Sequence, residues 1–189
     1  MLEFLKNIDT QLLLFFNGLN SPFWDQVMWW VSGSKSWIPM YAIILGYIIY
    51  KFRWRAVITI VIIALVVTLS DQISVHAFKN VFQRLRPCHT PELQNLVHLV
   101  KNKCGGQYGF VSSHAANTFA VAFFLSKLFK NKTFSIFIFV WATIVSYSRI
   151  YLGVHFPFDV LCGAILGSLI GYLGFIIHHY VMNKWVVKN

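Results

Sequence analysis

Five apolar stretches, each approaching the length of a membrane-spanning helix, constrain the fold of this chain more than any other feature. A helix of about 20 apolar residues crosses the hydrocarbon core of a bilayer. The chain is 57% hydrophobic and only 12% charged, and a soluble fold of 189 residues could not bury that much apolar surface in one core. The stretches comprise residues 36–50, 56–78, 114–128, 134–147 and 156–181.

The N-terminal segment, residues 2–31, is more ambiguous. Residues 12–16 are strongly apolar, but charged and polar residues interrupt the pattern on both sides. The segment predicts a first spanning helix or an amphipathic helix in the membrane interface, and we favour one of each. The sequence thus predicts an all-α, polytopic membrane helix bundle of about six transmembrane helices plus a short N-terminal interfacial helix. No linker divides the chain, so residues 1–189 are expected to form a single domain.

Short basic loops predict the orientation of the bundle. Lysine and arginine cluster in residues 51–55, 127–132 and 184–188, which fall on one side, and the positive-inside rule makes that side cytoplasmic. The other side carries nearly as many basic residues, so this orientation requires a functional site that holds several of them. The net charge of +10 fits contact with anionic headgroups. Nucleic-acid binding is disfavoured, because no basic stripe is interleaved with aromatic residues in a soluble segment.

One long polar segment, residues 80–113, lies on the predicted outer side and contains Cys88 and Cys104. In an oxidising compartment such a pair is expected to form a disulfide, and two reduced thiols in a cytosolic loop are the alternative. Closing a ring of this size contributes about 3 kcal/mol of stability. Cys162 lies in the last apolar stretch and is typical of a small core residue.

The first of three polar clusters is residues 79–87, where the third predicted span ends. Lys79 and Arg86 are seven residues apart, so two helical turns would place them on one face. Both side chains could simply extend to the lipid headgroups. A lysine and an arginine converging on one point instead suit a phosphate group, which accepts a point charge and a bidentate fork.

The second cluster is Ser112, Ser113 and His114, directly before an apolar helix. Serines at a helix start commonly cap free N–H groups. The same N–H groups and the helix dipole also form an anion site. His114 at the mouth of this helix is a candidate general acid.

The third cluster lies between the last two predicted spans and contains Arg149, His155 and Asp159. An acid in the first turn of a helix is favoured by the helix dipole, whatever its function. A carboxylate four residues from a histidine can also fix its tautomer and leave the second ring nitrogen free as a nucleophile. The chain has only six acidic residues, which makes this grouping the more notable.

All three clusters map to the same face of the membrane in the predicted topology, where they would surround one tetrahedral anion. His155 would attack phosphorus, and His114 would protonate the leaving oxygen and then activate water. The remaining groups would stabilise charge on the phosphoryl oxygens. These predicted phosphate-binding residues are Lys79, Arg86, Arg149, Ser112 and Ser113. Catalysis by a hard metal ion is disfavoured, because the few carboxylates are scattered along the chain.

The motifs resemble those of the type 2 phosphatidic acid phosphatase superfamily, which are K-x6-R-P, P-S-G-H and S-R-x5-H-x3-D. The first is complete in residues 79–87 and the third in residues 148–159. In the second, Ser112 and His114 match, whereas Val111 and Ser113 replace the proline and the glycine.

The resemblance implies a six-helix membrane bundle and a metal-free phosphatase with a phosphohistidine intermediate and no cofactor. For a bacterial member it implies the inner membrane and an active site facing the periplasm. The substrates it implies are lipid phosphates such as undecaprenyl pyrophosphate, phosphatidylglycerol phosphate, phosphatidic acid and the phosphates of lipid A. A lipid phosphotransferase with the same site and a non-catalytic lipid transporter are the alternatives, and the sequence leaves the oligomeric state open.

Overall fold

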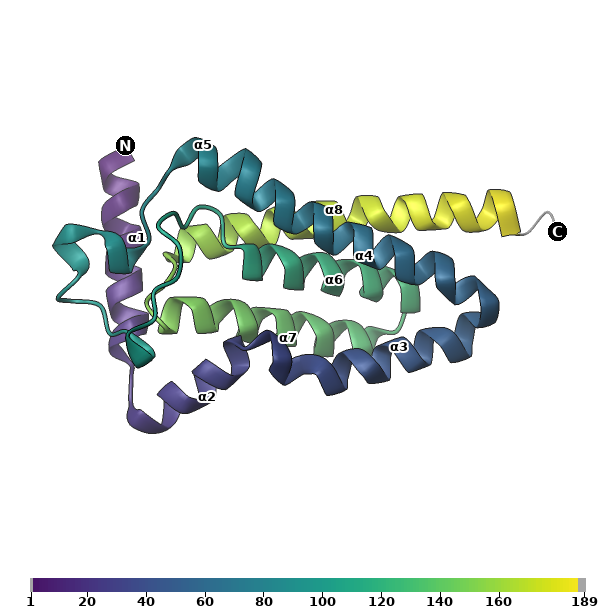
Figure 1. Cartoon of the computed structure of the whole chain (residues 1–189), viewed down its shortest axis with the longest axis horizontal. Coiled ribbons are helices and arrows are strands. Elements are labelled where there is room, and N and C mark those ends of the chain that lie inside the picture. Colours follow the sequence, from purple (N-terminus) through teal and green to yellow (C-terminus); the bar gives the residue numbers. More distant parts are fainter. Residues whose placement is uncertain (1, 187–189) are drawn as a thin grey trace.

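The computed structural model describes residues 2–186, and the fold in this part is helical, with one isolated β-bridge between Leu85 and Tyr108. The all-α fold class predicted from the sequence is confirmed. The predicted apolar stretches form the long helices, which run along the long axis of the molecule (Figure 1). They are α3 (Ile38–Phe52), α4 (Ala56–Gln72), α6 (Ser113–Phe129), α7 (Lys132–Tyr151) and α8 (Pro157–Val181).

Short helical turns extend or connect these helices. The α4 helix continues through a π-helical segment, η3 (Ile73–Lys79), into α5 (Asn80–Phe82). The other short elements are η1 (Ser34–Trp37), η2 (Arg53–Arg55), η4 (Pro87–His89), η5 (Pro91–Leu93), η6 (Val100–Asn102) and η7 (Met182–Val186).

Three helical stretches are long and apolar enough to cross a membrane: Ser34–Phe82, which folds into α3 and α4, Lys132–Tyr151 and Pro157–Lys184. Their outer surfaces carry exposed large apolar side chains, such as Ile43 and Leu169. Such a surface requires lipid around it. The α6 helix lies against α4, α7 and α8, and it forms the centre of the bundle.

The N-terminal segment forms two helices, α1 (Leu2–Gly18) and α2 (Pro22–Ser32). Figure 1 shows that α1 crosses one end of the bundle instead of running along its axis, which makes the predicted count of six spans approximate. The buried residues of α1 are Asp9, Leu13 and Asn17, which follow one another at four-residue spacing and therefore form one face. Two of the three are polar, so this face meets polar groups at the bundle end.

The α6 and α8 helices approach each other closely along a line of glycines in α8. A Cβ atom at Gly167 or Gly171 would overlap the carbonyl oxygen of Ala116 or Ala120 in α6. Small residues at four-residue spacing permit such close approach between membrane helices. This close helix–helix contact fixes the start of α6 relative to the start of α8.

We therefore predict that Gly167→Ala destabilises the protein by about 1–3 kcal/mol, because the added methyl group forces the two helices apart. Gly46→Ala in α3 is the matched control, since no atom lies within 4 Å of its Cβ position. Alanine is the better helix former by up to about 1 kcal/mol, so the control should be neutral or stabilising. Thermal unfolding in detergent micelles measures both, and equal midpoints for the two variants would contradict the close packing.

Candidate active site

The candidate site lies at the end of the bundle that α1 crosses. A cavity of about 500 Å³ opens there, and six of the predicted site residues line it. They come from all three sequence clusters and are Lys79, Arg86, Ser113, His114, Arg149 and His155. The loops at η2 and between α6 and α7 lie at the opposite end (Figure 1).

Lys79 is the last residue of the π-helical segment η3. Its Nζ donates a hydrogen bond to Ser113 Oγ at 2.6 Å, and Ser113 Oγ is also 2.6 Å from Ser74 Oγ. This contact connects the first and second sequence clusters. It also aims the ammonium group at the start of α6.

Arg86 reaches the cavity by a different route from the predicted one. Two continuous helical turns from Lys79 were expected, but α5 ends at Phe82, and Gln83 adopts a left-handed conformation (φ 46°). The prediction of one helical face was wrong because the helix ends before it reaches Arg86. Arg86 is instead held by backbone oxygens: its Nε donates to Tyr108 O and its Nη1 to Cys104 O, both at 3.3 Å.

Cys104 is joined to Cys88 by a disulfide, with 6.0 Å between the Cα atoms. Cys88 lies two residues after Arg86, and the backbone oxygen of Cys104 accepts a hydrogen bond from the Arg86 guanidinium group. The bond therefore closes a loop around the Arg86 side chain.

Arg149 lies in the last turn of α7 and is held from α2. Its Nη1 donates a hydrogen bond to Ser32 Oγ. Its Nε is buried and has no hydrogen-bond partner among the residues that the structure describes. A donor left unpaired beside a cavity suits an anionic ligand.

His155 lies in the turn between α7 and α8 and is 1% exposed. Its Nδ1 is 3.5 Å from Oδ2 of Asp159, which is fully buried. Nδ1 faces this carboxylate but has no hydrogen-bond partner among the described residues, and we expect Nε2 to be the ring nitrogen that meets a ligand. Burial, followed by the positive charges of Arg86, Arg149 and Lys79, holds the pKa of His155 well below its ordinary value of 6.5. The imidazole is consequently neutral near pH 7, as a nucleophile must be.

Ser112 is placed differently from its neighbours. It is fully buried and is not among the residues that line the cavity. Its backbone N–H donates to Asp159 O at 3.0 Å, which joins the start of α6 to the start of α8. Direct contact of its hydroxyl with phosphate stays a prediction.

Sequence reasoning missed Arg84 and Asp9 as parts of this site. Arg84 Nη1 donates to Asp159 Oδ1 at 2.8 Å, and its Nη2 donates to Asp9 Oδ2 at 2.7 Å. The available signal was an acid within a largely apolar helix, in a chain with only six acids. Such a carboxylate requires a partner.

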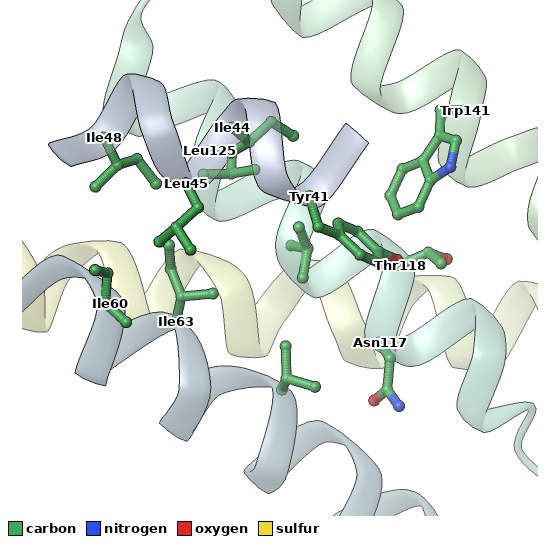
Figure 2. A pocket seen from close by; sticks show the side chains of 12 residues that line it. Tyr41, Ile44, Leu45, Ile48, Ile60, Ile63, Asn117, Thr118, Leu125 and Trp141 are labelled. Carbon is green, nitrogen blue, oxygen red and sulfur yellow. The ribbon is translucent and has the colours of Figure 1, made fainter. Parts of the chain in front are cut away.

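A second, apolar cavity of about 380 Å³ adjoins the first, and side chains from α3, α4 and α6 surround it together with Trp141 of α7 (Figure 2). The two cavities share Tyr41, Val67, Asn117 and Thr118 in their linings. A molecule with one anionic end and one apolar end could therefore occupy both.

Comparisons with known proteins agree with the resemblance that the sequence motifs indicate. The sequence model of the PAP2 superfamily matches residues 59–183. A lipid A 4'-phosphatase of Bacteroides thetaiotaomicron is 47% identical over 182 residues, which cover 95% of this chain and 80% of that protein. A lipid A 4'-phosphatase of Porphyromonas gingivalis is 33% identical over 186 residues, which cover 98% and 79% of the two chains.

A solved structure is also similar along most of its length. It is a transmembrane PAP2 type phosphatidylglycerolphosphate phosphatase from Bacillus subtilis, with 25% sequence identity and a TM-score of 0.70. The superposition covers 94% of this chain and 87% of that one.

The disulfide generates one prediction. Cys88→Ser should lower the free energy of unfolding by about 3 kcal/mol and should weaken phosphate binding, because Arg86 loses a fixed acceptor at Cys104. Cys162→Ser is the control, since Cys162 is a free cysteine in α8. Thermal unfolding and competition by inorganic phosphate measure the two effects, and unchanged phosphate affinity in Cys88→Ser would contradict the proposed support of Arg86.

The depressed pKa of His155 leads to a second prediction, which concerns the pH dependence of this side chain. A lowered pKa means that the neutral imidazole persists as the pH falls through 6.5 and becomes protonated only below the folded-state value. Titration of ¹⁵N-histidine-labelled protein by NMR, with the signal assigned from His155→Gln, should show this. In Arg86→Gln the pKa should move upward, because one positive charge is lost. A His155 signal that titrates at or above pH 6.5 in the parent protein would contradict the assignment.

Proposed function

The chain belongs to the PAP2 superfamily, and from this premise we propose that it is a membrane enzyme that hydrolyses a phosphate monoester of a lipid. The observation that carries the proposal is the shared cavity, in which two imidazoles and three cations from separate segments face one volume of about 500 Å³. A phosphate group matches this lining in charge and in hydrogen-bonding capacity.

In the proposed first step, Nε2 of His155 attacks phosphorus. The N–P bond forms as the ester P–O bond breaks, and protonated His114 gives its proton to the leaving lipid oxygen. Burial and the neighbouring positive charges lower the pKa of His114 to about 3, so the negative charge of the phosphate substrate must raise that pKa for His114 to act as the acid. Asp159, 3.5 Å from Nδ1, stabilises the positive charge that develops on the ring. The product of this step is a phosphohistidine and a lipid alcohol.

In the proposed second step, water attacks the phosphorus of the phosphohistidine and His114 takes its proton. The N–P bond breaks, His155 is restored and inorganic phosphate leaves. Lys79, Arg86 and Arg149 stabilise the phosphoryl oxygens in both transition states. Ser113, which accepts a hydrogen bond from Lys79, is well placed to orient that lysine.

The cavity lining also supports catalysis without a metal ion. Among the residues that line the cavity, Asp71 is the one carboxylate, and three cations line the same cavity. Divalent hard metals favour several carboxylate oxygens. The cations themselves would supply the positive charge that a metal provides in other phosphatases.

The preferred substrate in this proposal is lipid A phosphorylated at its 4' position. The names of the relatives at 47% and 33% identity support this choice. The adjoining apolar cavity supports a lipid in general, because it offers about 380 Å³ for part of an acyl chain.

We further propose that the protein lies in a bacterial inner membrane with its active site facing the periplasm. Two observations support this orientation. The basic loops around η2 and between α6 and α7 lie at the end opposite the site (Figure 1), as the positive-inside rule requires of a cytoplasmic side. The disulfide lies at the site end, where an oxidising compartment would maintain it.

The test is phosphate release by purified protein in detergent with EDTA. Lipid A, phosphatidylglycerol phosphate, undecaprenyl pyrophosphate and phosphatidic acid are compared by kcat/KM, and lipid A should give the highest value. His155→Gln should reduce turnover by at least about a thousandfold. His179→Gln, at an exposed position of α8 near its C-terminal end, should keep it.

Three outcomes would count against the proposal. Turnover that depends entirely on added Mg²⁺ would reject metal-free catalysis. Turnover that requires a second lipid as acceptor would indicate a phosphotransferase. Normal turnover in His155→Gln would remove the nucleophile from the mechanism.

A further inference from the structure

Arg84 forms a bridge between two buried carboxylates from opposite parts of the chain. One guanidinium nitrogen donates to Asp159 and another to Asp9, at 2.8 and 2.7 Å. Both aspartates are fully buried, whereas the Arg84 side chain is 27% exposed. The guanidinium group also lies 4.1 Å from the centre of the Phe156 ring, which restricts its orientation.

The remaining carboxylate oxygens are also used, and all of them hold the turn that carries His155. Asp9 Oδ1 accepts from the backbone N–H of Phe158 at 2.8 Å. Asp159 Oδ2 accepts from the backbone N–H of Phe156 at 3.0 Å and faces His155 Nδ1. The three side chains thus fix both the carboxylate beside His155 and the backbone on either side of Pro157.

We propose that Asp9 and Arg84 are positioning residues for the reaction, acting through Asp159 on His155. This inference rests on the proposed function, in which His155 is the nucleophile. Neither Asp9 nor Arg84 lines the cavity, so their effect is on the orientation of the dyad and on its charge. We name the three side chains Asp9, Arg84 and Asp159 the carboxylate clamp.

The charge of the clamp explains why two acids are present. One guanidinium paired with Asp159 alone would neutralise the carboxylate that His155 needs. Asp9 accepts from one of the two guanidinium nitrogens, so that with both acids ionised the clamp carries one net negative charge. A buried negative charge next to Nδ1 favours the positive ring that forms when Nε2 becomes phosphorylated.

Removing one member of such a buried group leaves its partner uncompensated. Without Arg84, Asp159 would retain a buried oxygen with no cation beside it and would favour its protonated form. A protonated Asp159 no longer selects the Nδ1–H tautomer of His155, and Nε2 is then less available for attack.

The clamp also gives the N-terminal helix α1 a part in the active site. Asp9 lies on the buried face of α1 with Asn17, whose side chain donates to Tyr151 O at 2.7 Å and to His98 O at 3.0 Å. Asn17 Oδ1 accepts from His98 N at 2.8 Å. The face is therefore fixed against the end of α7 and the outer loop, which keeps Asp9 in register with Arg84.

The experiment compares Asp9→Asn, Arg84→Lys and the double variant in the lipid-phosphatase assay. Asp9→Asn keeps an acceptor for the Phe158 N–H but removes the charge, and Arg84→Lys keeps the charge but removes the bidentate fork. Each single change should lower kcat about tenfold to hundredfold, with KM within about twofold of the parent value. The double variant should lose no more than the weaker single variant, because the residues act as one unit.

Glu3→Gln is the matched control, because it removes an exposed charge from the same helix and should leave kcat unchanged. The fraction of folded protein is measured in parallel by thermal unfolding, and rates are expressed per folded molecule. Parent-like kcat in both single variants, a loss confined to KM, or additive losses in the double variant would each overturn the proposal.

A second readout does not depend on lipid hydrolysis. The ¹⁵N chemical shifts of His155 report its tautomer, and the Nδ1–H form should dominate in the parent protein and decline in Arg84→Lys, where Asp159 loses its bidentate partner. An unchanged tautomer population would overturn the clamp. If the parent protein releases no phosphate from any lipid but the tautomer shifts as expected, the proposed function fails and the positioning role stands.

Discussion

Electrostatic repulsion among Lys79, Arg86 and Arg149 is the constraint around which this end of the bundle is built, since all three line a cavity of about 500 Å³. Like charges at close range in a partly desolvated site oppose one another. The protein holds them with neutral oxygens instead of acids: a serine hydroxyl for Lys79, backbone carbonyls for Arg86 and Ser32 for Arg149. Their charge is therefore directed but not cancelled, and an anion in the cavity would relieve the repulsion.

Two acids near the site are used for a different purpose, whereas Asp71 lines the cavity itself. Asp9 and Asp159 pair with Arg84, which does not line the cavity. This separation keeps one arginine neutralised by structural carboxylates while three cations stay available. It also places a negative charge behind His155 and positive charges in front of it, an arrangement suited to a nucleophile that becomes positively charged as it reacts with an anion.

Much of this could be predicted from the sequence, because the signals were local. Each apolar stretch formed a helix, and six of the eight predicted catalytic and phosphate-binding residues line one cavity. The end of the helix between Lys79 and Arg86 could not be predicted from the sequence. Gln83 adopts a left-handed conformation there, but it is not a glycine, and its residue type does not indicate a turn. Arg84 and Asp9 were missed because their contacts join residues about 75 positions apart. The crossing of α1 over the bundle end depends on those same long-range contacts.

The π-helical segment before Lys79 has a consequence for how the length of this chain is constrained. A π-helical turn accommodates one more residue than an α-helical turn, so each residue beyond it is rotated by about 100° relative to an uninterrupted α-helix. Lys79 ends this segment and owes its direction toward Ser113 to that extra residue. The π-helical turn thus absorbs one residue between Asp71 and Lys79. A one-residue deletion there can be taken up by a return to α-helical geometry that keeps the lysine directed at the serine, whereas an uninterrupted α-helix of the present sequence would rotate it away.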